Sequence, residues 1–99
     1  MDSFLNKNWF TLTLVQQMVN IGNEVKRAVR FDSDSKKKNM FLDKAIQHTE
    51  LSMKDPKNQK VLPELYICKM VLEDYKGEHI LNCTKEQINK YFSSYIYLL

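Results

Sequence analysis

Two cysteines and two histidines are the residues of this 99-residue chain with the most versatile chemistry. His79 and Cys83 are four residues apart, whereas His48 and Cys68 lie elsewhere in the sequence. A structural zinc site needs four such ligands in closely spaced pairs, and a reactive thiolate needs a neighbouring base or positive charge. The spacing supports neither arrangement, and the two glycines stand too far apart for a phosphate-binding loop. We therefore predict no catalytic residue, no metal site and no cofactor, and interpret Cys68 as a small core residue.

Polar side chains gather on one side of the first expected helix. Spacings of four, three and four residues bring three amides and one guanidinium into line, and these residues are Gln16, Asn20, Asn23 and Arg27. A face that only contacts solvent more often carries Glu and Lys four residues apart. We interpret the four residues as a candidate polar groove, with Gln17 also on this outer side. The alternative is a plain solvated face.

Basic residues concentrate in the middle of the chain. Residues 26–60 include ten basic and five acidic side chains, a formal charge of +5, and the remainder has five basic and seven acidic ones, a charge of −2. Nearly all the basic residues are Lys, whereas surfaces that grip phosphate usually recruit Arg. Residues 36–38 and 54–60 fall at opposite ends of one expected helix, so their lysines need not form one patch. Nucleic-acid binding by residues 26–60 is therefore an alternative function.

The end of the chain is rich in apolar and aromatic residues. A helix that is apolar on nearly all sides needs burial on more than one side, and Tyr is favoured at protein interfaces. We predict an interface with a second copy of the chain, or with another protein, formed by Tyr91, Phe92, Tyr95, Tyr97 and Leu98. The alternative is that the last residues fold over the end of the molecule.

Four helices must position these residues. Apolar side chains recur every three or four residues along segments that span about residues 9–31, 35–54, 60–76 and 85–97. No segment alternates with a period of two over enough residues to indicate a strand. Because the connections are short, consecutive helices should lie antiparallel. We therefore predict an all-α fold with one domain over residues 1–99, an antiparallel four-helix bundle.

Capping residues mark the expected ends of these helices. Asn8 or Thr11 suits the start of the first helix, and Gly77 has the position of a left-handed residue that closes the third. Thr84 and Gln87 form a capping-box pair, in which each side chain satisfies a backbone N–H at the start of the fourth helix.

The composition is that of a folded globular protein, with 43% hydrophobic and 27% charged residues. The longest apolar stretch is far shorter than the roughly 20 residues that span a bilayer, so we expect no membrane partner. The first ten residues lack the basic segment and apolar run of a secretory signal. We therefore expect a cytoplasmic location and two thiols instead of a disulfide.

Several segments resemble small bacterial proteins of about this length that have no assigned activity. They are LVQQMVNIGNEVKRAV, the DPKN turn, LEDYKG and KYFSSY, so the resemblance spans nearly the whole chain. The helix pattern is also similar to the four-helix HEPN and nucleotidyltransferase-partner families, which are often components of toxin–antitoxin pairs. Active HEPN ribonucleases carry an Arg, four to six further residues and then a His. The nearest Arg before His48 is Arg30, so the chain departs from this motif, and the resemblance does not imply ribonuclease activity.

These observations favour a non-catalytic helical bundle that works by protein–protein interaction or self-association, most simply as a homodimer. Nucleic-acid binding and a HEPN-like toxin–antitoxin role are the alternatives.

Overall fold

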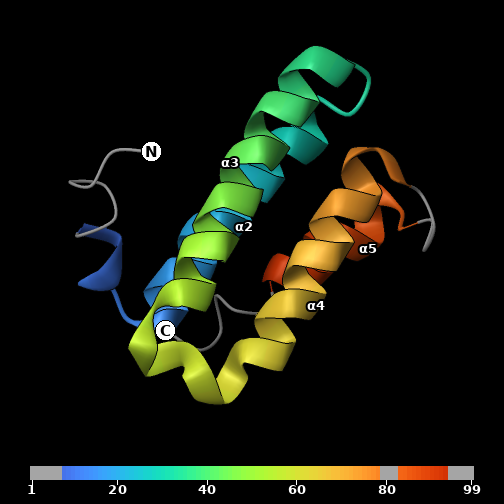
Figure 1. Cartoon of the computed structure of the whole chain (residues 1–99). Helices are drawn as coiled ribbons and strands as arrows, with labels where there is room; N and C mark the ends of the chain where they lie inside the picture. The colour runs from blue at the N-terminus through green and yellow to red at the C-terminus, as the bar shows by residue number, and fades with distance from the viewer. Residues whose placement is uncertain (1–7, 79–82, 94–99) are drawn as a thin grey trace.

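The computed structural model describes residues 8–78 and 83–93, and the regular structure of these residues is entirely helical (Figure 1). The four α-helices are α2 (Leu14–Arg30), α3 (Ser35–Lys54), α4 (Leu62–Glu73) and α5 (Lys85–Ser93). The 3-10 helix η1 (Pro56–Val61) precedes α4, and the π-helix η2 (Asp74–Glu78) follows it. The predicted all-α class is therefore confirmed for the described residues.

The first long helix begins later than the sequence predicted, because its cap is Thr13 and not Asn8 or Thr11. The Thr13 hydroxyl accepts a hydrogen bond from the Gln16 backbone N–H (3.1 Å), and Gln16 Oε1 accepts one from the Thr13 N–H (2.9 Å). This reciprocal pair is a capping box. Thr13 itself has extended backbone geometry, so α2 starts at Leu14, and residues 8–10 form a separate helical turn.

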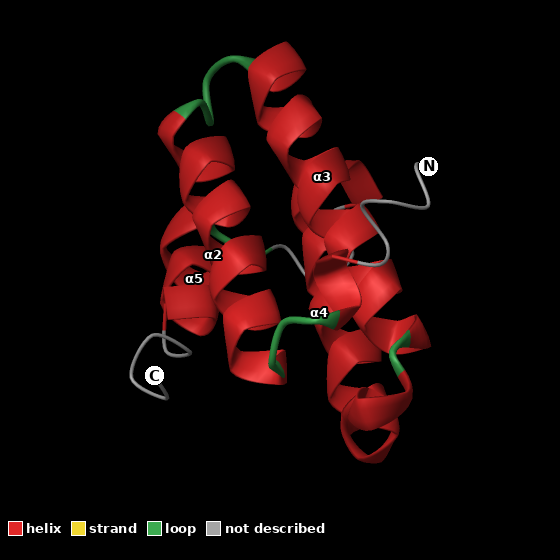
Figure 2. Ribbon diagram, turned by 90° about the vertical axis from the view of Figure 1, so that its left-hand side faces the viewer, coloured by secondary structure: helices red, strands yellow, loops and turns green. Residues whose placement is uncertain are grey.

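Helix α3 has the predicted bounds, residues 35–54. The Asp34 carboxylate caps its start by accepting a hydrogen bond from the Lys37 N–H (3.2 Å). Its end comes at Lys54, because Asp55 is extended and is followed by Pro56, which disfavours helical geometry in the preceding residue. Helices α2 and α3 lie side by side, joined by the turn of residues 31–34 (Figures 1 and 2).

The core lies between these helices and the two that follow. Helix α3 packs against α2 and α4, and α5 packs against α2. A Cβ added to Gly22 of α2 would lie 3.6 Å from the Cβ of Phe92 on α5, so these two helices approach closely. The largest wholly buried apolar side chains are Met18, Ile21, Leu42, Leu65, Leu72, Ile88 and Phe92. The finer prediction of an antiparallel four-helix bundle stays a prediction.

The predicted third helix, residues 60–76, is divided among three helical types. The 3-10 turns of η1 run to Val61, the α-helical part is α4, and the chain then widens into η2. Gly77 lies within η2, and its φ is outside the left-handed region, so the expectation that it closes a helix in left-handed geometry is wrong. Because the chain continues in π-helical turns there, no left-handed residue is needed at that position.

Helix α5 begins with the predicted capping box. The Gln87 N–H donates to Thr84 Oγ1 (3.1 Å), and the Thr84 N–H donates to Gln87 Oε1 (3.0 Å). The helix is described as far as Ser93, and the rest of the predicted helix, up to residue 97, lies outside the described residues. In the described part of the chain, no helix combines the length and apolar character needed to cross a membrane.

Candidate interaction surfaces

The thiol and imidazole groups do not come together as a site in the described residues. Cys68 is buried in the core as predicted, with its Sγ 3.3 Å from the Tyr91 hydroxyl oxygen. Burial raises the pKa of the Cys83 thiol, and the Asp74 carboxylate raises it further, so Cys83 is a poor nucleophile at neutral pH. Both cysteines are thiols, as expected. No group of three or more metal-ligating side chains occurs within residues 8–78 and 83–93, and His79 falls outside them.

The four residues of the predicted polar groove are all exposed on α2. Gln16 belongs to the capping box, and the Asn20 side chain donates to the Gln16 backbone oxygen (2.9 Å). Arg27 forms an ion pair with Glu24 (2.7 Å). These contacts are local to one helix, and ligand binding by this face stays a prediction.

Gln17 is the amide of α2 that the fold buries, so its predicted place on the outer side is wrong. Its Nε2 donates to the Trp9 backbone oxygen (3.0 Å) and to Asp55 Oδ2 (2.9 Å). Its Oε1 accepts a hydrogen bond from Asn58 Nδ2 (2.8 Å). The physical reason is that the turn of residues 8–12 and the start of η1 cover this end of α2, on the side that buries Ile21 and Ala28 further along the helix.

Gln17 is one of five residues that form a buried polar corner, together with Trp9, Ser52, Asp55 and Asn58. Trp9 Nε1 donates to Ser52 Oγ (3.0 Å), and Asn58 Nδ2 also donates to the Ser52 backbone oxygen (2.9 Å). Buried polar groups of this kind cost stability unless they are hydrogen-bonded. The polar corner therefore fastens the N-terminal turn, α2, α3 and η1 to one another.

Asp55 brings a negative charge into the polar corner. Burial alone would raise the pKa of this carboxyl, but hydrogen bonds from Lys57 and Gln17 outweigh burial and lower the pKa below its usual range. The Lys57 ammonium pairs with Asp55 and also donates to the Phe10 backbone oxygen (2.9 Å). The Asp55 carboxylate and the Lys57 ammonium therefore both stabilise the fold.

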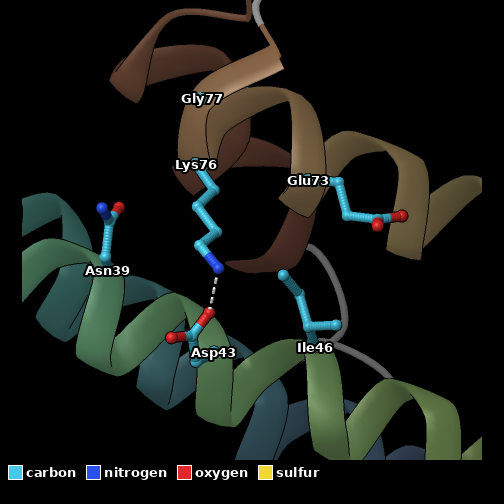
Figure 3. Close-up of a pocket in the computed structure, with 6 residues that line it drawn as sticks. All are labelled: Asn39, Asp43, Ile46, Glu73, Lys76 and Gly77. Atoms are coloured by element: carbon cyan, nitrogen blue, oxygen red, sulfur yellow. Dashed lines mark ion pairs between the residues drawn. The ribbon is translucent and has the colours of Figure 1, made fainter.

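A cavity of about 390 Å³ lies between α3 and the end of α4 with η2 (Figure 3). Lys76 reaches from η2 to Asp43 on α3, and their charged atoms are 2.5 Å apart. The Glu73 side chain points away from this ion pair. The described lining residues are Asn39, Asp43, Ile46, Glu73, Lys76 and Gly77. They include no thiol, imidazole or hydroxyl side chain, and the ion pair links η2 to α3.

The outer face of α4 consists of Tyr66, Ile67 and Met70, which are 53%, 51% and 55% exposed. The opposite side of the same helix supplies Leu65, Cys68 and Leu72 to the core. Beside Tyr66, a groove of about 260 Å³ lies between α4 and the end of α3. Sequence reasoning missed the outer face, although LYICKM is apolar on both sides of a helix. The test applied to the C-terminal segment would have found it.

The structure describes only part of the predicted C-terminal interface. Tyr91 is partly buried, while Phe92 is 2% exposed and packs against Gly22, so Phe92 is a core residue and its assignment to an interface is wrong. Tyr95, Tyr97 and Leu98 lie outside the described residues.

Comparisons with known proteins do not assign a family, because no family model, curated protein or solved structure matches this chain. The resemblance to HEPN and nucleotidyltransferase-partner bundles therefore stays a prediction.

Proposed function

We propose that this protein is a non-catalytic helical protein that associates with a second copy of itself through the outer face of α4. The observation that carries the proposal is the exposure of three large apolar side chains, Tyr66, Ile67 and Met70, within little more than one helical turn. Contiguous exposed apolar patches mark interaction sites, and burial of such area contributes about 25 cal/mol per Å². The other large exposed apolar side chains of the described residues, Phe10 and Met40, belong to other segments.

Charges around the outer face support a second copy as the partner. Glu64 and Glu73 are negative, whereas Lys69 is positive, and all three belong to α4. A rim of one sign would repel an identical rim, but a rim of both signs allows two copies to meet. Tyr and Met are also enriched where protein interfaces are buried.

The remaining parts of the proposal concern the helices and the end of the chain. An antiparallel four-helix bundle is supported by the short connections and by the packing of α3 against α2 and α4 and of α5 against α2. Tyr95, Tyr97 and Leu98 are proposed to add a second apolar region to the interface.

Light scattering coupled to size-exclusion chromatography tests self-association. We expect a dimer at tens of micromolar for the wild type and a monomer for Ile67→Asp, because a carboxylate in the centre of the interface would be buried without a partner. Met40→Asp is the matched control, since Met40 is 48% exposed on α3, and this variant should stay dimeric. Circular dichroism verifies that each variant is folded. A strictly monomeric wild type at tens of micromolar would overturn the proposal.

A further inference from the structure

Positive charge is concentrated where α2 turns into α3. Residues 26–38, here called the hairpin tip, include six basic and two acidic side chains and carry a formal charge of +4. The remaining residues include nine basic and ten acidic ones and carry −1. Both arginines of the chain, Arg27 and Arg30, lie in the hairpin tip. The net positive charge of the protein therefore originates from this one segment.

The basic side chains of the hairpin tip come from two helices that meet at one end of the molecule. The last turns of α2 expose Lys26, Arg27 and Arg30, and the first turn of α3 exposes Lys36 and Lys37. Among the described residues, Lys26, Arg30 and Lys36 have no ion-pair partner. Their charges are therefore available to a ligand.

The two acidic residues of the hairpin tip are used by the fold itself. Asp32 accepts a hydrogen bond from the Tyr75 hydroxyl (2.5 Å) and lies 3.6 Å from Lys38 Nζ. The Tyr75 hydrogen bond lowers the pKa of Asp32, which therefore stays ionised near neutral pH. The Asp34 carboxylate faces the backbone N–H of Lys37 as the cap of α3. Neither carboxylate pairs with the outward cations Lys26, Arg30 and Lys36.

Lys36, unlike Lys37 and Lys38, makes no ion pair or ring contact with the described residues that would favour a positive charge in the first turn of α3. The dipole of a helix disfavours positive charge at its N-terminus, and the first turn of α3 contains no acidic residue. Lys37 and Lys38 lie over the rings of Phe31 and Tyr75, but Lys36 makes no such contact among the described residues. Departures from local preference without a structural gain are typical of functional sites.

We propose that the hairpin tip binds the phosphate backbone of a nucleic acid without sequence preference. The guanidinium group of Arg30 matches phosphate oxygens in a planar fork, and Lys26 and Lys36 add point charges, whereas Arg27 is paired with Glu24. The lysines at residues 54–60 are excluded from this site, because the 20 residues of α3 separate them from the tip by about 30 Å.

A nucleic acid fits this tip better than an anionic membrane does. Amphipathic helices that lie in a membrane interface insert exposed aromatic or aliphatic side chains beside their cations. Phe31 of the hairpin tip and Phe41, three residues beyond the tip on α3, are half-buried and stack on each other with ring centroids 5.8 Å apart. They are therefore not positioned to enter a bilayer. This site is independent of self-association by α4, so each proposal can fail without the other.

Fluorescence anisotropy with labelled duplex and single-stranded oligonucleotides over a series of salt concentrations tests the site. The double variant Arg30→Glu with Lys36→Glu changes the tip, and Lys54→Glu with Lys60→Glu makes the same change of charge at the far end of α3. We expect the affinity of the tip variant to fall by about tenfold or more. The slope of log affinity against log salt concentration should also become shallower, by the amount expected for the loss of roughly two phosphate contacts. The control should lose much less. The milder Arg30→Gln with Lys36→Gln should show a smaller loss in the same direction.

Three results would overturn the proposal. The first is no binding of the wild type to either oligonucleotide at low salt. The second is an equal loss of affinity in the tip and control variants, which would show that only net charge matters. The third is binding to vesicles of anionic phospholipid without binding to oligonucleotides.

Discussion

The two sides of α4 have similar composition but opposite surroundings. Leu65 and Leu72 are buried against the rest of the chain, whereas Ile67 and Met70, on the other side, are more than half exposed. The amphipathic pattern of a helix indicates how much burial the helix needs, but its neighbours decide which side receives it. The uncovered side of α4 is therefore informative about binding partners, and the covered side is informative about the stability of the fold.

Polar residues of α2 show the same contrast between inward and outward positions. Gln17 is buried and bonded to the N-terminal turn and to η1 and its cap, whereas Asn20 is exposed and bonded only to its own helix. An amide side chain of α2 therefore either links elements of the fold or lies exposed to solvent, depending on whether other elements cover it.

The largest expected effect separates the two sides of α4. Leu72→Ala should lower the free energy of unfolding by about 3 kcal/mol, because it leaves a cavity in the core. Met70→Ala should change that free energy by less than about 0.5 kcal/mol in the monomer, because the side chain is exposed. Urea denaturation at a protein concentration low enough to dissociate any dimer measures both values. Equal losses would show that the two sides are not distinct.

The next effect separates the inward and outward amides of α2. Gln17→Ala should cost about 2 kcal/mol of unfolding free energy, since Asp55 and Asn58 each lose a buried hydrogen-bond partner. Asn20→Ala, at an exposed site, should cost less than about 0.5 kcal/mol. Thermal or urea unfolding followed by circular dichroism gives the comparison. A Gln17→Ala protein as stable as the wild type would contradict the structural role of the polar corner.

The pH dependence of stability tests the charge in the polar corner. The pKa of Asp55 is lowered from 3.8 in the folded state, so the unfolded chain binds more protons at acidic pH. Its contribution to stability is therefore fully present above the unfolded pKa and is lost as the pH falls through the folded pKa. Asp55→Asn should be less stable than the wild type near neutral pH, and the difference should shrink in acid. A difference that stays constant as the pH falls would show that the carboxylate is not stabilised by Lys57 and Gln17.

The smallest effect separates two threonines at the start of α2. Thr13→Ala should cost about 1 kcal/mol, because the helix loses its capping hydroxyl. Thr11→Ala should cost less, since the Thr11 hydroxyl bonds only to the Asn8 backbone oxygen in an exposed turn. Differential scanning calorimetry of the two variants measures the contrast. The opposite order would place the cap at Thr11.

Most features that depend on nearby residues were predicted from the sequence, but the capping box of Thr13 and Gln16 at the start of α2 was missed. The helical class follows from apolar spacing, the bounds of α3 follow from Asp34 and Pro56, and the start of α5 follows from Thr84 with Gln87. Each is decided within a few residues of chain, so pattern and capping chemistry are sufficient.

Features that depend on contacts between distant segments were not predicted. Gln17 is buried by Asp55, which follows it by 38 residues, and periodicity within α2 carries no information about that contact. Phe92 was assigned to an interface because its helix looked too apolar, but the packing of α5 against α2 buries it in the core. The excess apolar surface of the described residues lies instead on α4, where the pattern was visible but the uncovered side was not.

The most direct test of the α4 interface is isotope-filtered NMR on a mixture of labelled and unlabelled protein. We expect intermolecular nuclear Overhauser effects from the methyl groups of Ile67 and Met70 to the second copy. The methyl groups of Leu65 and Leu72, buried within each copy, should show none. Intermolecular effects that are absent, or that occur only at other surfaces, would contradict self-association through the outer face of α4.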